Sequence, residues 1–307
     1  MKNIIDTKWG AVSAAVFCNL LWGSAYPAIK LGYEQFDITS SVSEKLFFAG
    51  IRFVLAGLMV IAAGAAVNKR IPCLNRGNVR SIAVTGLIYT ALQYVFFYVG
   101  LSNTTGSNGS IVNSSTTFMA LVAGHIFCGE RLNAKKTAGA VIGFAGVVTV
   151  LMSEGIGGVS FTGEGFILIA AACFVAGSML SKAAAENTDA MTVTGYNLLI
   201  GGGILTAAGM AGGGMLKNVT VQGILILGYL AFLSAAAFTL WTMLLRRWEV
   251  GRISVFNFLI PVSGTILSAV FMHENIFSIR YALSLLLVCT GIILANSSEK
   301  SVFTRKE

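Results

Sequence analysis

Two stretches of the chain decide the fold: TTFMALVAGHIFCGERL at residues 116–132 and IPVSGTILSAVFMHENI at residues 260–276. Each is an apolar run that reaches a glutamate near its end. Setting Glu130 on Glu274 shifts one copy by 144 residues, and a recurrence at a fixed distance indicates an internal duplication. The other positions that then coincide are Phe127 with Phe271, Asn113 with Asn257, Ser110 with Ser254 and Thr117 with Pro261.

The composition places these runs in a membrane. Of the 307 residues, 55% are hydrophobic and only 11% are charged, whereas soluble domains devote about a quarter of their residues to charge. Apolar runs of about 20 residues, the length that a helix needs to cross the hydrocarbon core, recur along the chain. A β-barrel is disfavoured because the runs are continuously apolar. We predict an all-α integral membrane protein with ten transmembrane helices. The predicted spans are residues 9–30, 44–67, 79–100, 106–128, 134–152, 164–182, 191–212, 220–244, 252–272 and 278–296.

The basic residues orient the chain. Of the 21 Lys and Arg residues, 16 fall in segments on one side of the predicted topology, four fall on the other side, and Arg52 lies within a span. By the positive-inside rule, both termini are cytoplasmic. The net charge of +8 therefore sets the orientation and does not indicate a nucleic-acid partner. We expect a multi-pass protein of the cell (plasma) membrane, whose partners are the lipid bilayer and a small-molecule substrate.

The duplication divides the spans into two sets of five, in residues 1–152 and 153–307. Because five is odd, the second copy crosses the membrane in the opposite orientation, and the halves form an inverted repeat. Such repeats are typical of secondary transporters, in which two similar halves expose a site near the midplane to either side in turn. A weaker echo is that Trp22 and Phe174 each stand eight residues before a lysine.

Three motifs carry a resemblance to a known family. They are LLWGSAYPAIK at 20–30, FFAGIRFVLAG at 47–57 and GERLNAKKTAGAVIGFAGV at 129–147. With Pro261 thirteen residues before Glu274, they make the chain similar to the drug/metabolite transporter superfamily, specifically its EamA type. The resemblance implies two five-helix repeats and metabolite transport. The chain departs from the family at Thr117, where proline is usual, and in HENI at 273–276, which replaces Gly-Glu-x-Leu.

Arg52 is the clearest functional candidate within a span, because hydrocarbon does not solvate a charged group. The span still inserts, since eleven Leu, Ile, Phe and Val residues between 46 and 67 offset the cost of one Arg. Three roles are open. Arg52 binds an anionic group of the substrate, reaches to the outer interface, or ties helices together.

The two in-span prolines point to a cavity. Pro27 frees the carbonyl of Gly23 and Pro261 that of Asn257, because proline has no N–H to donate four residues back. Irregular backbone at membrane depth persists where protein or a water-filled cavity satisfies it. Cavity residues are therefore predicted around these positions, namely Trp22, Gly23, Tyr26, Asn113 and Asn257. Kinks that only shape helix packing are the alternative for both prolines.

Aromatic and amide side chains in other spans extend the predicted cavity. In the span 79–100, Tyr89, Gln93, Phe96 and Phe97 share a helical face by their spacing of three to four residues, with Tyr94 on a neighbouring face. Further candidates are Tyr196, Asn197 and Trp241. Packing is the alternative role for each. Such a lining would suit amino acids or other small amphipathic metabolites.

The remaining motifs are assigned to packing, gating and helix ends. Gly139, Gly143 and Gly146 form a small-residue stripe that lets helices approach closely, either within one chain or across a homodimer. Glu130 and Glu274 close two related helices on opposite sides of the membrane, and a gating role for them is a further hypothesis. With two His and no Cys/His cluster, the sequence predicts neither a metal site nor a cofactor.

These features favour a secondary transporter of small metabolites that works by alternating access. Amino acids or related compounds are the first expectation for the substrate, and export is the expected direction. No Walker loop indicates ATP as the energy source, and no hydrolase or protease motif indicates an enzyme. The alternatives are a sugar-phosphate or nucleotide-sugar carrier, which would need more cavity cations than Arg52, and a non-transporting membrane receptor or scaffold.

Overall fold

A computed structural model describes residues 5, 7–38, 41–128, 133–151, 160–186, 188–248 and 255–296. Within these ranges every regular element is a helix, as the apolar runs predict. Hydroxyl and carboxylate side chains cap several helix starts. The Ser41 hydroxyl accepts a hydrogen bond from the Glu44 backbone N–H, and the Asp189 carboxylate accepts from the backbone N–H groups of Met191 and Thr192.

Helix occupies each of the ten predicted spans. The elements are α1 Lys8–Gln35, α2 Val42–Asn68, α3 Val79–Thr85, the π-helix η2 Gly86–Leu92, α4 Gln93–Ser102, α5 Gly106–Asn113, α6 Ser115–Cys128, α7 Ala134–Leu151, the π-helix η4 Phe161–Gly165, α8 Phe166–Glu186, α9 Ala190–Ala211, α10 Val221–Arg247, the 3₁₀ turn η5 Val255–Phe258, α12 Leu259–Met272 and α13 Ile279–Asn296. The segments α3, η2 and α4 follow one another without a gap, as do η4 and α8.

Six of these helical stretches are long and apolar enough to cross a membrane: α1, α2, residues 79–102, residues 161–186, α9 and α10. The prediction of ten uninterrupted spans is therefore confirmed only in part. The fourth predicted span is divided at Ser114 into α5 and α6, and the ninth begins as a 3₁₀ turn before α12. The helical segments that contain α12 and α13 are apolar but shorter.

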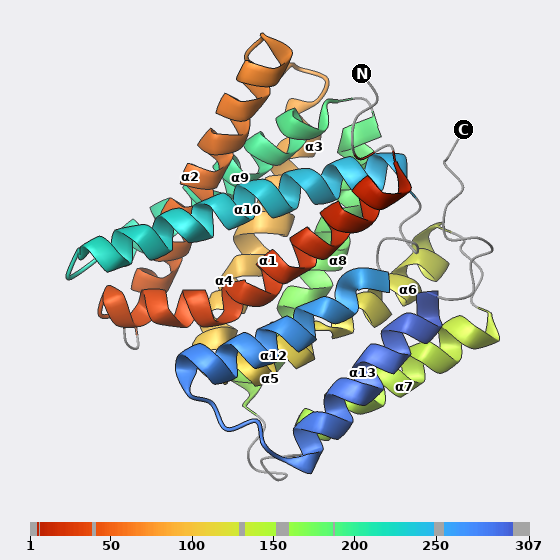
Figure 1. Ribbon diagram of the computed structural model, residues 1–307. Coiled ribbons are helices and arrows are strands. Elements are labelled where there is room, and N and C mark those ends of the chain that lie inside the picture. The colour runs from red at the N-terminus through yellow and green to blue at the C-terminus, as the bar shows by residue number, and fades with distance from the viewer. Residues whose placement is uncertain are drawn as a thin grey trace.

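Helices from the two halves of the chain pack side by side. α2 lies along α9, α7 lies along α13, and α1 lies against both α10 and α12 (Figure 1). Glycines permit the closest of these contacts. A Cβ on Gly202 of α9 would lie 2.6 Å from the backbone nitrogen of Val54 in α2.

The predicted glycine stripe of α7 packs within the chain. An added Cβ on Gly139 would overlap the backbone of Ala295, and one on Gly146 would lie 2.8 Å from the carbonyl oxygen of Ser284, both on α13. Gly143 faces the ring of Phe118. Of the two alternatives for this stripe, the contacts within one chain are the ones observed, and the homodimer stays a prediction.

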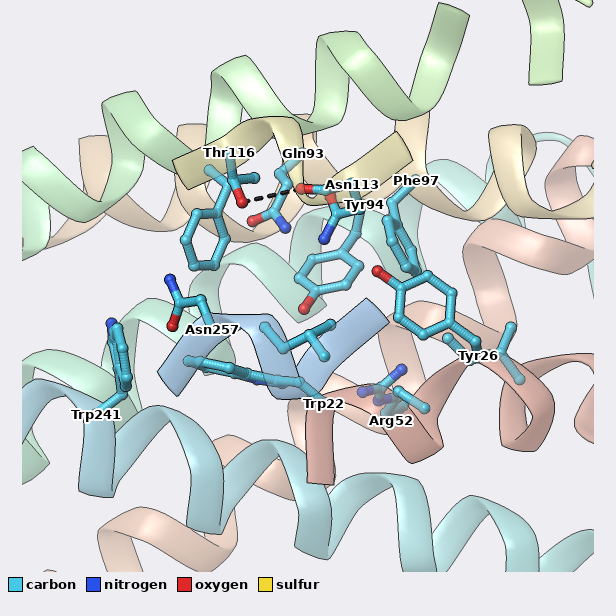
Figure 2. Close-up of a pocket in the computed structure, with 14 residues that line it drawn as sticks. Trp22, Tyr26, Arg52, Gln93, Tyr94, Phe97, Asn113, Thr116, Trp241 and Asn257 are labelled. Atoms are coloured by element: carbon cyan, nitrogen blue, oxygen red, sulfur yellow. Dashed lines mark hydrogen bonds between the residues drawn. The ribbon is translucent and has the colours of Figure 1, made fainter. Parts of the chain in front are cut away.

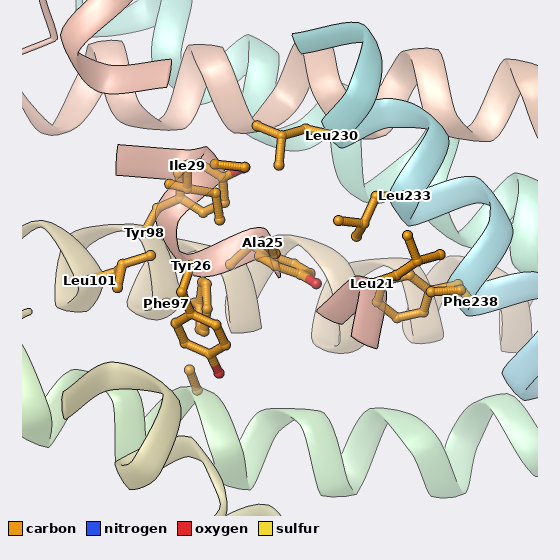
Figure 3. Packing of buried hydrophobic residues seen from close by; sticks show 14 of the residues in the cluster. Leu21, Ala25, Tyr26, Ile29, Phe97, Tyr98, Leu101, Leu230, Leu233 and Phe238 are labelled. Atoms are coloured by element: carbon orange, nitrogen blue, oxygen red, sulfur yellow. The ribbon is translucent and has the colours of Figure 1, made fainter. Parts of the chain in front are cut away.

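The apolar core is built around α1. Leu21, Ala25 and Ile29 recur every four residues and so share one face of the helix. They are buried against α10, whose Leu233 and Phe238 appear in the same cluster (Figure 3). This packing leaves the neighbouring face of α1, with Trp22 and Tyr26, directed into the centre of the molecule.

Candidate functional site

A cavity lies where α1, α2, α4, α5, α6, α8, α10, η5 and α12 come together (Figure 2). The space open to the centre of a water molecule is about 60 Å³. Seven of the predicted cavity residues line it: Trp22, Tyr26, Arg52, Gln93, Asn113, Trp241 and Asn257. The others that line it are Ala25, Ile29, Tyr94, Phe97, Thr116, Phe174 and Ile260.

Arg52 supplies the charge of the cavity. Its side chain is 2% exposed, so the alternative in which it reaches the interface is wrong. Its Nε donates to the Ser234 hydroxyl at 2.9 Å and to the Leu230 carbonyl at 3.2 Å, and its Nη1 donates to the Tyr98 hydroxyl at 2.9 Å. These bonds tie α2 to α10 and α4. All three acceptors are neutral, and within the described part of the chain no carboxylate forms an ion pair with Arg52.

Aromatic rings form one wall of the cavity. The Trp22 ring centroid lies 6.2 Å from that of Phe174, 5.8 Å from that of Phe238 and 5.2 Å from that of Trp241, all edge to face. Such contacts hold the rings in place while leaving an apolar surface toward the cavity. Tyr89 packs behind this wall against Phe174 and Phe238, and is not itself a lining residue.

The π-helix η2 decides which side chains of the third span face the cavity. A π-turn adds one residue to a helical turn and so rotates the side chains of the helix beyond it. The lining residues after it are Gln93, Tyr94 and Phe97, whereas Phe96 packs against Phe166 at a centroid distance of 5.2 Å. Of the four residues that share a face by regular spacing, Gln93 and Phe97 therefore line the cavity and Tyr89 and Phe96 do not, whereas Tyr94 of the neighbouring face does.

Asn197 helps to hold this π-turn. Its side-chain oxygen accepts a hydrogen bond of 2.9 Å from the Thr90 hydroxyl within η2. Asn197 is 1% exposed and lies outside the cavity lining. Asn197 is therefore a packing residue in this structure, which is the alternative role stated for it in the sequence analysis.

Gly23 and Tyr196 also lie outside the cavity lining. A Cβ on Gly23 would overlap the Ser263 hydroxyl, so this glycine lets α1 approach α12. The Tyr196 hydroxyl donates to the Pro72 carbonyl at 2.9 Å and thereby fixes the segment after α2. Neither residue is directed into this cavity, because a residue type that is compatible with a cavity also occurs at packing positions.

The prolines lie where the helices depart from regular geometry. Pro27 lies inside α1, which bends along its length (Figure 1). Pro261 follows the change from the 3₁₀ turn η5 to α12 by two residues. Neither proline lines the cavity, but their neighbours Tyr26 and Ile260 do.

Glu274 joins the two halves at one end of the molecule. Its carboxylate accepts hydrogen bonds from the Gly106 backbone N–H at 2.7 Å, the Ser107 backbone N–H at 2.9 Å and the Ser107 hydroxyl at 2.6 Å. These donors open α5, and a helix N-terminus stabilises a negative charge. Glu274 therefore does more than end a helix. Glu130 lies outside the described residues.

Further polar contacts surround this carboxylate. Lys30 of α1 donates from Nζ to the Thr104 carbonyl at 2.6 Å, and the Thr104 hydroxyl donates to Glu164. The Tyr281 hydroxyl donates to the Asn108 side chain at 2.6 Å. Together these bonds connect the loop before α5 to α1 and η4, and α5 itself to α13.

Comparison with known proteins identifies the family. A model described as the EamA-like transporter family matches residues 9–152 and again residues 161–297. The chain belongs to this family. It is therefore a small-molecule transporter of a membrane, and the family resemblance predicted from the motifs is confirmed.

Relatives of this EamA-like transporter span almost its whole length. An uncharacterized transporter of Bacillus subtilis (strain 168), YvbV, is 24% identical over 98% of this chain and 95% of its own. A probable amino-acid metabolite efflux pump of Escherichia coli (strain K12) is 25% identical over 91% of this chain and 92% of its own. A crystal structure of a protein shares 19% identity with a TM-score of 0.70, covering 94% of this chain and 97% of that one, which shows the same fold.

Most of the unpredicted residues that line the cavity of this EamA-like transporter can be found from patterns in the sequence. Thr116 and Ile260 coincide under the shift of 144 residues, and Phe174 is the counterpart of Trp22. Ala25 and Ile29 follow Trp22 and Tyr26 by three residues each, a spacing that makes side chains neighbours on the surface of a helix. Tyr94 is the exception, because its position depends on the π-turn.

Proposed function

We propose that the chain is a secondary transporter that moves small metabolites by alternating access between two inverted five-helix halves. Amino acids or related compounds are the first candidate substrates, and export is the proposed direction. The observation that carries the proposal is the cavity itself. Residues from both halves line it, and it holds a buried arginine with no carboxylate partner in the described part of the chain.

Matched residues of the two halves meet at this cavity. Asn113 and Asn257, which coincide under the 144-residue shift, are both lining residues, and so are Thr116 and Ile260. Trp22 and its counterpart Phe174 touch ring to ring. Equivalent positions of an inverted repeat are expected to converge only near the axis that relates the halves, which is where such transporters bind their substrates.

The helix contacts support the same symmetry. When each predicted span is exchanged for the one five places along, the α2–α9 and α7–α13 contacts map onto themselves. The α1–α12 contact becomes α8–α6, and the α1–α10 contact becomes α8–α4, and all of these pairs are in contact. This agreement favours the two-half division at residues 152 and 153. With an inverted arrangement and the positive-inside rule, both termini are cytoplasmic and Glu274 lies on the opposite side.

Glu274 is proposed to latch the non-cytoplasmic end of the cavity. Its three hydrogen bonds join the end of α12, in the second half, to the start of α5, in the first half. Opening this end would require the carboxylate to leave those donors. By the repeat, Glu130 has the corresponding gating role at the cytoplasmic end.

Arg52 is proposed to bind an anionic group of the substrate. Among the described residues that line the cavity, it is the one with a full charge. One cation suits a single carboxylate, whereas a sugar phosphate or nucleotide sugar would call for several. The name of the Escherichia coli relative, a probable amino-acid metabolite efflux pump, supports both the substrate class and the direction.

The proposal is tested with purified protein in liposomes. Labelled amino acids, nucleobases and sugar phosphates are offered one at a time, and we expect carrier-dependent flux for at least one amino acid. Absence of flux for all three classes would overturn the transport proposal. Cysteines placed at positions 130 and 274 should react with impermeant reagents from opposite sides, and labelling from the same side would overturn the inverted topology.

A further inference from the structure

Two amide oxygens at the cavity lack the hydrogen-bond donor that they need. Gln93 Oε1 and Asn257 Oδ1 are buried and make no hydrogen bond in the described part of the chain. The Gln93 side chain is only 5% exposed, and both residues line the cavity. By contrast, the buried Asn197 oxygen is satisfied by Thr90. Buried polar groups are seldom left unpaired, so these two oxygens indicate a ligand.

The hydrogen-bonding atoms that face the cavity define the chemistry of that ligand. An amide oxygen accepts hydrogen bonds and cannot donate them, so the missing partner carries N–H or O–H groups. Arg52 has the opposite character, since a guanidinium only donates. Its hydrogen bonds use Nε and Nη1, and Nη2 makes none within the described residues. The cavity thus offers a donor for an anion and acceptors for a cation or a neutral donor.

The donor Arg52 and the acceptor Asn257 lie at different places in the cavity. Figure 2 shows Arg52 beside Tyr26 and Asn257 beside Trp241, with the Trp22 ring between them. Aromatic faces near Asn257 favour a positive charge at that end, because the ring quadrupole attracts cations. A ligand that satisfies both ends carries an anionic and a donating group, separated by an apolar body that can lie on the Trp22 ring.

We infer that the cavity takes an ω-amino acid, whose ammonium and carboxylate groups stand at opposite ends of an apolar chain. Gln93 and Asn257 bind the ammonium group, while Arg52 binds the carboxylate. This inference rests on the proposed function and assigns specificity within the same cavity. Gln93 and Asn257 then decide whether a carboxylic acid with an amino group is preferred over one without it. The aromatic wall contacts the apolar chain between the two groups, and its rings near Asn257 add to the preference for a positive charge.

The experiment compares each of three ω-amino acids with the same acid lacking its amino group: 4-aminobutanoate with butanoate, 6-aminohexanoate with hexanoate, and 8-aminooctanoate with octanoate. Uptake by proteoliposomes is measured for each compound. In the unaltered chain we expect at least one pair to show a preference of about tenfold or more for the amino acid, the size of one charge-assisted hydrogen bond. The Gln93→Leu and Asn257→Leu variants should lose most of this preference while still moving the des-amino acid.

Two controls separate recognition from folding. Gln93→Glu keeps an acceptor at the site and should retain the preference, whereas Gln222→Leu applies the same substitution to an exposed glutamine at the start of α10 and should change nothing. Thermal unfolding in detergent checks that each variant is folded. A preference that survives in both Gln93→Leu and Asn257→Leu, or three pairs without any preference, would overturn the inference and leave transport intact. Absence of uptake for all six compounds and for the other metabolite classes would instead overturn the proposed function.

Discussion

The two halves interrupt the same helix in different ways. In the second half Pro261 has no N–H, so the Asn257 carbonyl loses its α-helical donor. In the first half the matching residue is Thr117, whose N–H donates instead to the Ser114 carbonyl at 3.1 Å. The freed carbonyl of Asn113 accepts from the Thr116 hydroxyl at 2.9 Å.

This comparison shows that the duplicated feature is the helix break rather than the proline. In both halves the break falls beside an asparagine that lines the cavity. The departure of Thr117 from the family pattern therefore leaves the local architecture in place.

The halves differ more deeply in charge. α2 carries Arg52, whereas α9, its partner across the interface, contains no charged residue between Ala190 and Ala211. Instead α9 places glycines against the α2 backbone. Positions that match between the two halves thus shape the cavity, whereas Arg52, which has no charged counterpart in α9, supplies its charge.

The largest effect is expected at the α2–α9 interface. A side chain at Gly202 would meet the α2 backbone at Val54 and Phe53, which cannot yield as a flexible side chain would. We expect Gly202→Leu to cost about 3 kcal/mol or more and to abolish a monodisperse folded species in detergent. Gly203→Leu is the matched control, because no atom lies within 4 Å of an added Cβ there. Equal thermal stability of the two variants would contradict the packing described for this interface.

Arg52 comes next, with a large effect on transport and a smaller one on folding. Arg52→Gln removes the charge and should lower amino-acid flux at least about tenfold, since a charge-assisted hydrogen bond is worth about 1.5–3 kcal/mol. Arg52→Lys should rescue it only partly, because an ammonium does not reproduce the guanidinium geometry. Flux is normalised to folded protein, and Arg76→Gln, at an exposed arginine, is the control. Normalised flux that is unchanged in Arg52→Gln would assign Arg52 to helix tying alone.

Substitution of Glu274 should have a moderate effect that is confined to the non-cytoplasmic side of the membrane. In Glu274→Gln, an amide NH₂ replaces one carboxylate oxygen and faces donors, so the bonds to Gly106 and Ser107 weaken. We expect a loss of about 1 kcal/mol in stability and faster labelling of a cysteine at the cavity residue Ala25 by an impermeant reagent added outside. The chain without the Ala25→Cys substitution corrects for the native cysteines. An unchanged labelling rate would contradict the latch, and Glu186→Gln, at an exposed glutamate, should leave it unchanged.

The features that depend on residues close together in the chain could be predicted from the sequence. Apolar run length gave the helical segments, and the 144-residue shift pointed to Asn113 and Asn257. Features fixed by distant partners were missed. The register of Tyr94 depends on a π-turn held by Asn197, which lies more than 100 residues away in the chain, and Gly23 is explained only by its contact with Ser263.

The smallest effect is expected from making the two breaks alike. Thr117→Pro places a proline in the first half at the position that matches Pro261. It removes one backbone hydrogen bond, to Ser114, but no α-helical bond to Asn113, and it also removes a buried hydroxyl that has no partner in the described part of the chain. We expect stability to change by about 1 kcal/mol or less and flux to stay within about fivefold. Leu121→Pro, inside α6, should cost about 3 kcal/mol or more because there proline removes a helical bond and clashes with the preceding turn. If thermal unfolding showed the two prolines to be equally damaging, the first half would contain no break equivalent to that at Pro261, and the symmetry of the cavity would have to rest on its side chains alone.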